Sequence, residues 1–158
     1  MGICGQTTLS IGFLLTATAT AAFADCSPDV VTIYGDWGQA NFKVTIADDA
    51  RERARGLMNV PQMPTMTGML FVYDGPQPVS FWMRNTLIPL DMLFIDPAGK
   101  ILVVHPDAIP LDETSIDGGD GVQYVLEING GLAARLGIAP GDVIQNPVLG
   151  PGAARPCD

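Results

Sequence analysis

Short apolar runs, separated by glycine, proline, asparagine or aspartate, dominate the chain after residue 29. Eight of them have the length and the boundaries of strands: 30–33, 41–46, 69–73, 79–86, 90–96, 100–105, 124–128 and 143–144. Most follow one another without a helix between them, which favours antiparallel pairing. The pattern therefore predicts an α+β fold: a strongly bent, mostly antiparallel sheet or half-open β-barrel with one or two short helices.

Two segments show helical signals instead. Asp48 and Asp49 offer an N-cap, and the apolar positions that follow have the spacing of one buried helical face: Ala50, Ala54, Leu57 and Met58. A second short helix is predicted over 131–136. The first helix carries three arginines. Arg51 and Arg55 stand one turn apart, where like charges destabilise an isolated helix unless an acidic partner is near. Arg53 is expected to point elsewhere, into solvent.

The first part of the chain has the features of an export signal. Residues 11–23 are apolar or small, too few to span a bilayer, and Ala22-Phe23-Ala24 fits the small-x-small pattern of a cleavage site. We predict a signal peptide at 1–24, a single globular domain at 25–150 and a Pro/Gly-rich tail at 151–158. The mature protein is then periplasmic or secreted. An uncleaved anchor is the alternative interpretation.

Cleavage after Ala24 removes Cys4 and leaves two cysteines in the mature chain, Cys26 and Cys157. An even pair in an exported protein predicts a disulfide, here between the two ends of the domain. The alternative is that both thiols are free in disordered ends.

The charge of the chain limits its partners. There are 17 Asp and Glu against 8 Lys and Arg, a formal net charge of −9. Such an acidic surface repels phosphate backbones and anionic lipid headgroups. We therefore expect no nucleic-acid partner, and no membrane association after leader cleavage.

A first candidate site lies on the predicted strand 79–86. Strict alternation places Trp82 and Arg84 on one face with the hydroxyls of Ser80 and Thr86. A tryptophan beside an arginine and hydroxyls suits a surface that stacks on a sugar or holds an anion. Alternatively, Trp82 covers the sheet edge and Arg84 lies over it.

Two carboxylates interrupt runs that are otherwise apolar. Asp91 is the only ionisable residue in 89–95, and Glu127 is the only acidic residue in 124–128. A carboxylate among apolar neighbours must pair, accept hydrogen bonds or stay protonated. Three interpretations follow: an ion-pair network with Arg51, Arg55 or Arg84, a ligand-binding role, or an acid/base pair acting on a glycan.

Metal chemistry has little support. His105 is the only histidine, no nucleophile motif lies beside it, and it is expected in a loop. Met63 and Met66 could offer thioethers to Cu(I), but two loop methionines and one distant histidine make a poor site. Zinc, phosphate-loop and dinucleotide motifs are absent from the sequence. We therefore expect no metal and no cofactor.

Several motifs closely resemble those of the bacterial and archaeal domain-of-unknown-function family 192. They are RARGLM at 53–58, GMLF at 68–71, FWMRNTLIPLD at 81–91, YVLEIN at 124–129 and LGIAPGD at 136–142. The resemblance covers about residues 30–145 and implies a half-open β-barrel with a short helix, exported in many cases, and no assigned activity. It places the family's characteristic residues at Arg55, Gly56, Met58, Trp82, Met83, Asn85, Thr86, Asp91, Glu127 and Asn129.

Together these features predict a module that binds a small polar or saccharide ligand in the cell envelope. The predicted ligand-binding residues are Arg55, Trp82, Arg84, Asn85, Thr86, Asp91 and Glu127. The alternatives are a structural or partner-binding domain held by buried ion pairs, and a hydrolase acting on an envelope glycan.

Overall fold

The structure is a computed structural model that describes residues 1–2 and 26–157. The predicted signal peptide and its cleavage site lie almost wholly outside the described residues. In the described part of the chain, no helix is long and apolar enough to cross a bilayer.

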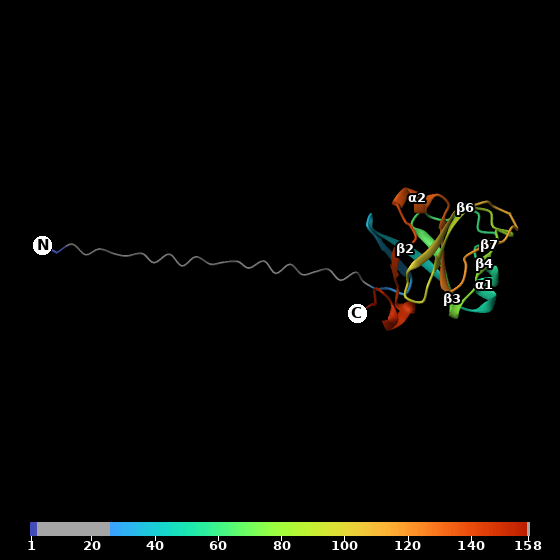
Figure 1. The fold of residues 1–158 in the computed structure, drawn as a ribbon. Coiled ribbons are helices and arrows are strands. Elements are labelled where there is room, and N and C mark those ends of the chain that lie inside the picture. Colours follow the sequence, from blue (N-terminus) through green and yellow to red (C-terminus); the bar gives the residue numbers. More distant parts are fainter. Residues whose placement is uncertain (3–25, 158) are drawn as a thin grey trace.

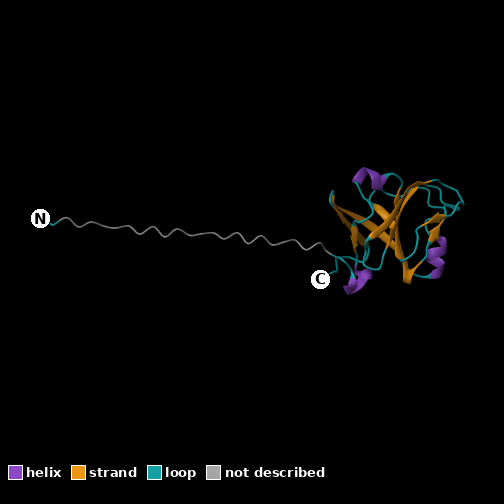
Figure 2. Cartoon of the chain, in the orientation of Figure 1, coloured by secondary structure: helices purple, strands orange, loops and turns teal. Residues whose placement is uncertain are grey.

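One seven-stranded sheet forms the body of the domain (Figures 1 and 2). Its order is β6-β5-β8-β3-β2-β1-β9, and every neighbouring pair is antiparallel except β2 and β3. The strands are β1 (Val30–Gly35), β2 (Gly38–Ala47), β3 (Thr67–Gln77), β5 (Leu90–Ile95), β6 (Ile101–Ala108), β8 (Val122–Asn129) and β9 (Val143–Gln145). The parallel step is connected by α1 (Ala50–Arg55), as a parallel crossover requires.

The sheet curls until its two edges meet at one end. Ile101 N donates to Asp142 O, and Ile144 N donates to Gly99 O, both at 2.8 Å. These bonds join the start of edge strand β6 to edge strand β9, while the other end of the sheet stays open. The predicted α+β fold with a half-open barrel is confirmed.

Two apolar clusters pack on the two faces of the sheet. Leu126 and Ile128 of β8 belong to one cluster with helix α2 (Leu132–Leu136), whereas Val125 belongs to the other with Leu57, just after α1. All six residues of β5 are buried. The central strands β5 and β8 are therefore enclosed on both sides, which explains their continuous apolar runs.

The predicted strand at 79–86 is wrong beyond its third residue. Only β4 (Ser80–Phe81) is extended, and it pairs with β7 (Ile116–Asp117) in a separate two-stranded sheet. The chain then turns, with Thr86 N donating to Met83 O and Asn85 at φ 54°. The turn ends the alternation, so Asn85 is exposed and Thr86 is buried.

The segments around residue 105 and after residue 145 are also more ordered than expected. β6 continues through His105 to Ala108, and Pro147–Gly152 form 3₁₀ turns on both sides of a kink at Gly150, with Leu149 buried. Further along, Arg155 lies over the ring of Tyr34 at 3.9 Å. Part of the segment after residue 150 therefore contacts β1 through Arg155.

The predicted disulfide is confirmed: Cys26 and Cys157 are bonded across a sequence separation of 131, with their Cα atoms 5.8 Å apart. It closes nearly the whole domain into one loop, which lowers the entropy of the unfolded chain.

Removing this bond should lower the free energy of unfolding by about 2–4 kcal/mol. We expect Cys26→Ser, Cys157→Ser and the double variant to lose the same amount in urea denaturation, because each removes the same link. A single variant that loses clearly less than the double one would show that the link is not the source of the stability.

Candidate functional site

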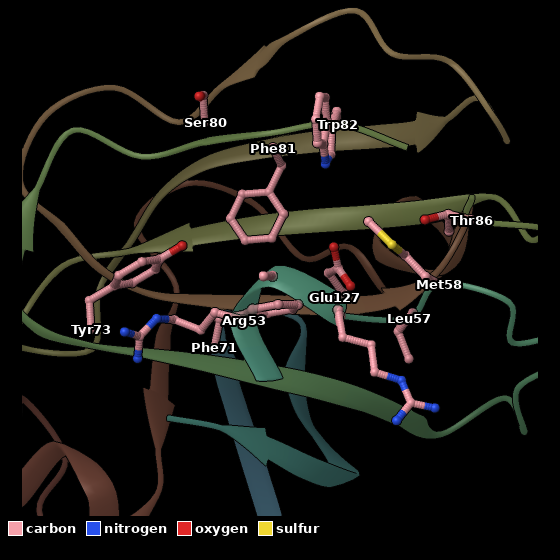
Figure 3. A pocket seen from close by; sticks show the side chains of 13 residues that line it. Arg53, Leu57, Met58, Phe71, Tyr73, Ser80, Phe81, Trp82, Thr86 and Glu127 are labelled. Carbon is pink, nitrogen blue, oxygen red and sulfur yellow. The ribbon is translucent and has the colours of Figure 1, made fainter. Parts of the chain in front are cut away.

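A cavity of about 200 Å³ opens between α1, β3 and the β4 segment (Figure 3). Glu127 of β8 lies at its floor, the exposed Trp82 forms part of its rim, and the buried Thr86 lines its wall. The lining residues are Arg53, Ala54, Arg55, Gly56, Leu57, Met58, Phe71, Tyr73, Ser80, Phe81, Trp82, Thr86 and Glu127.

Glu127 is the buried acid of this cavity. Its register partners on the two neighbouring strands are Met69 and Met92, so its surroundings in the sheet are apolar. The side chain is 4% exposed, and Oε2 is fully buried without a hydrogen-bond partner among the described residues. Burial raises the pKa of Glu127 to about 8. The carboxyl is therefore protonated at neutral pH and points into the space between Phe81 and Met58 (Figure 3).

Aromatic rings form one wall of the cavity. Phe81 meets Phe71 edge to face at 4.9 Å and Phe94 at 5.9 Å between ring centroids. These contacts fix Phe81 deep in the wall. Trp82, the next residue, is 46% exposed and presents its ring at the rim. A rigid apolar wall that ends in an exposed indole can receive the face of a ring-shaped ligand.

The expectation that Arg53 is solvated is wrong. Its Nη1 donates to Val72 O at 2.8 Å and also to Asp48 O, and its guanidinium lies 5.1 Å from the Tyr73 ring centroid. Burial raises the pKa of the Tyr73 hydroxyl, Arg53 opposes this shift and Glu127 adds to it. Arg53 therefore fixes the end of the cavity where Tyr73 lies.

Arg55 stands at the boundary between two cavities. It lines the Glu127 cavity together with a second one, of about 290 Å³, on the other side of the helix end. Gly56, also shared by both, has φ 49°, and an added Cβ there would lie 3.2 Å from the Phe71 ring. A residue without a side chain thus lets the helix end approach the aromatic wall.

Asp91 does not reach the cavity. It pairs with Ile128 across the strands, so it lies on the sheet face opposite to Glu127. Its Oδ1 accepts from the backbone N–H groups of Asp107 and Gly131, and its Oδ2 from Ala133, at 2.7–2.8 Å. Asp91 thus ties β6 and the start of α2 to β5. The two carboxylates cannot work as an acid/base pair on one substrate.

The interpretation of a buried ion-pair network is also corrected. Asp91 is satisfied by backbone amides, and burial is the only cause of the raised pKa of Glu127. An arginine within ion-pair distance would lower that pKa. Asp91 is therefore held by backbone amides, whereas Glu127 is buried in its neutral form. Neither acid forms an ion pair with an arginine among the described residues.

The remaining predicted residues lie at or beside the rim. The Arg84 guanidinium stacks over the Trp82 ring at 5.3 Å, while Thr86 lines the cavity directly. Asn85 supports the rim: its carbonyl accepts from Asn59 N at 2.8 Å, and its Nδ2 lies 4.0 Å from Met58 Sδ. The structure thus brings together Arg55, Trp82, Thr86 and Glu127, and leaves Asp91 outside.

Several lining residues were not among the predicted ligand-binding residues. Phe71 and Phe81 have the pattern of ordinary core residues, and both are also packed in the core. Tyr73 follows an apolar run at a strand end. The family motifs gave an indication of the lining: the whole of RARGLM lines the cavity, and Phe71 and Phe81 belong to GMLF and FWMRNTLIPLD.

The comparisons with known proteins agree with the motifs. The family model DUF192, described as "Uncharacterized ACR", matches residues 31–146. A solved protein of unknown function from Novosphingobium aromaticivorans is 38% identical, with a TM-score of 0.71, over 84% of this chain and 99% of that one. A "putative transcription regulator" from Sinorhizobium meliloti is 40% identical, with a TM-score of 0.72, over 78% and 96%. No curated protein matches this chain.

Proposed function

The chain belongs to the DUF192 family, whose description is "Uncharacterized ACR". We propose that its Glu127 cavity binds a small polar ligand, best a single sugar ring. The observation that carries the proposal is the unpartnered Oε2 of Glu127. A buried polar atom without a partner costs about 1–3 kcal/mol, so native structures rarely keep one without a reason. A ligand hydroxyl supplies the missing partner.

The protonation state of Glu127 suits a hydroxylated ligand. A neutral carboxyl has one donor and free acceptor positions, as a sugar hydroxyl has. Protonation at neutral pH follows from the raised pKa of about 8. Such a group can exchange two hydrogen bonds with one sugar and brings no charge that must be neutralised.

The volume of the cavity and its aromatic rim limit the size and the shape of the ligand. A volume of about 200 Å³ lies below the ~300–1,000 Å³ of pockets for drug-sized molecules. One ring fits this volume better than an oligosaccharide. The exposed Trp82 ring then covers the apolar face of that ring.

The setting we propose for this binding is the cell envelope. The disulfide fits a chain that has left the cytoplasm. The name of the Sinorhizobium meliloti relative suggests a role at DNA. In this chain, however, 17 acidic residues against 8 basic ones give a net negative charge that repels the phosphates of the DNA backbone. A saccharide of the envelope is the ligand class that agrees with both the disulfide and the acidic net charge.

Fluorescence of Trp82 tests the proposal directly, because the chain has two tryptophans, Trp37 and Trp82. In Trp37→Phe only Trp82 emits, and we expect its emission to shift when a binding sugar is added. Calorimetry on the unaltered protein should give the affinity. Trp82→Ala should weaken it about fivefold to tenfold, since an aromatic contact contributes roughly 1 kcal/mol.

The matched control is Trp82→Phe, in which only Trp37 emits. Trp37 donates to Asp142 Oδ2 at 2.8 Å and does not line the cavity, so its emission should stay constant. Equal sugar affinity in the unaltered protein and in Trp82→Ala would contradict the proposal. So would the absence of any sugar that shifts the emission of Trp82.

A further inference from the structure

The charge of the residues that line the Glu127 cavity is opposite to that of the whole chain. Acidic residues outnumber basic ones 17 to 8 overall. Among the lining residues, however, there are two arginines, Arg53 and Arg55, and a single acid, Glu127. Outside the lining, the Arg84 guanidinium lies over the Trp82 ring, Glu113 lies in the hollow beside that ring, and Glu52 lines the second cavity with Arg55. The positive excess is therefore confined to the lining itself. A local excess of positive charge on an acidic protein attracts an anion to this place.

We propose that the ligand is an acidic sugar, whose carboxylate binds Arg55 while its ring hydroxyls meet Glu127 and its apolar face covers Trp82. This inference rests on the proposed function and names the ligand class for the same cavity. A guanidinium can hold a carboxylate through two parallel hydrogen bonds, which gives the ligand a fixed direction.

Arg55 is better placed than Arg53 for this contact. Arg53 is already used within the fold, because its Nη1 donates to two backbone carbonyls and its guanidinium stacks on Tyr73. Arg55 is exposed and lines both cavities at the end of α1. Its neighbour on the helix, Arg51, is also exposed but lines neither cavity.

Glu127 tolerates an anion because it is uncharged at neutral pH. The titratable groups that line the cavity with it are Arg53, Arg55 and Tyr73, and the exposed Glu113 lies in the adjoining hollow beside Trp82. Above the raised pKa of about 8, Glu127 becomes negative and repels the ligand carboxylate. Binding of an acidic sugar should therefore weaken above pH 8, whereas the arginines keep their charge.

Sugars that differ only at C6 provide the test. Glucuronate, glucose and 6-amino-6-deoxyglucose carry a carboxylate, a hydroxyl and an amine at this position, and galacturonate, galactose and 6-amino-6-deoxygalactose repeat the series with another stereochemistry. Calorimetry at pH 7 should show about tenfold tighter binding of one uronate than of its neutral partner, as expected for one charge-assisted hydrogen bond. The amine should bind most weakly.

Two substitutions assign the preference to Arg55. Arg55→Met should remove the tenfold advantage of the uronate over the neutral sugar, measured as the ratio of the two affinities in this same variant. Arg51→Met, one turn away, should keep the advantage. In the unaltered protein the uronate affinity should fall about tenfold from pH 7 to pH 9, and Glu127→Gln should abolish this fall.

The outcomes separate the two proposals. Equal binding of uronate and neutral sugar, or a preference for the amine, overturns the acidic-sugar inference and leaves sugar binding intact. An advantage that survives in Arg55→Met also overturns it. Absence of binding by all six sugars, with unchanged Trp82 emission, overturns the proposed function and this inference together.

Discussion

Replacing Asp91 by alanine should lower the free energy of unfolding by roughly 5 kcal/mol or more. The Asp91 carboxylate is fully buried and accepts three hydrogen bonds from the backbone amides of Asp107, Gly131 and Ala133. A hydrogen bond to a charged group contributes about 1.5–3 kcal/mol, and here three buried amides would lose their partner at once. Urea denaturation at neutral pH measures the loss.

Two further variants show whether the hydrogen bonds are the cause. Asp91→Asn keeps an oxygen that can accept from Asp107 and Gly131, but turns an amide nitrogen toward the N–H group of Ala133. Its loss should therefore be intermediate. The Asp96 carboxylate lies in an exposed turn and accepts one hydrogen bond, from Lys100 N. Asp96→Ala should therefore lower the free energy of unfolding by about 1 kcal/mol or less. If Asp91→Ala costs no more than Asp96→Ala, the proposed tie between β5, β6 and α2 is contradicted.

Asp91 and Glu127 show how far the sequence could predict the site. Both interrupt apolar runs, and this signal correctly predicts that both are buried. What separates their roles is the register of β5 against β8, which pairs Asp91 with Ile128 and Glu127 with Met92. A shift of one residue would put both acids on the same face. Register depends on contacts between distant segments, so local patterns do not contain it.

The strands that could be predicted are those enclosed by the sheet. β5 and β8 are buried on both faces, and their apolar runs are long and continuous. The segment 79–86 misled because its side chains can be read as the alternation of a half-buried strand. There Met83 and Thr86 are buried by a turn, in which Met83 N donates to Asp112 O and Thr86 N to Met83 O. Asn85 tolerates its positive φ better than most residues do, but asparagine occurs in strands as well.

The aromatic wall could not be predicted as part of a site. Phe71 and Phe81 are apolar residues whose rings serve the core and the cavity at the same time. The role of Arg53 is hidden for a similar reason, because its partner is the carbonyl of Val72, 19 residues away on β3. Helical spacing alone assigns Arg53 to the solvent side. Long-range backbone contacts of this kind appear only in the folded chain.

Glu127→Gln should make the protein more stable, and the gain should grow with pH. The pKa of Glu127 is about 8 in the folded protein and 4.5 in the ordinary exposed state. Between these values the folded chain keeps a proton that the unfolded chain has released, so the stability of the unaltered protein falls as pH rises. The difference in pKa corresponds to roughly 4–5 kcal/mol at 1.36 kcal/mol per unit. Glutamine does not titrate, so the free energy of unfolding of Glu127→Gln does not fall in this way as pH rises.

The test compares the two proteins by urea denaturation from pH 4 to pH 9. The advantage of Glu127→Gln over the unaltered protein should be constant below pH 4.5, rise through the neutral range and level off above pH 8. Glu113→Gln, an exposed acid beside the same rim, should show a constant small difference across the whole range. Parallel pH profiles for Glu127→Gln and the unaltered protein would mean that Glu127 is ionised or paired in the fold. A buried acid that lowers the stability of the fold at neutral pH is best explained by a ligand that uses it.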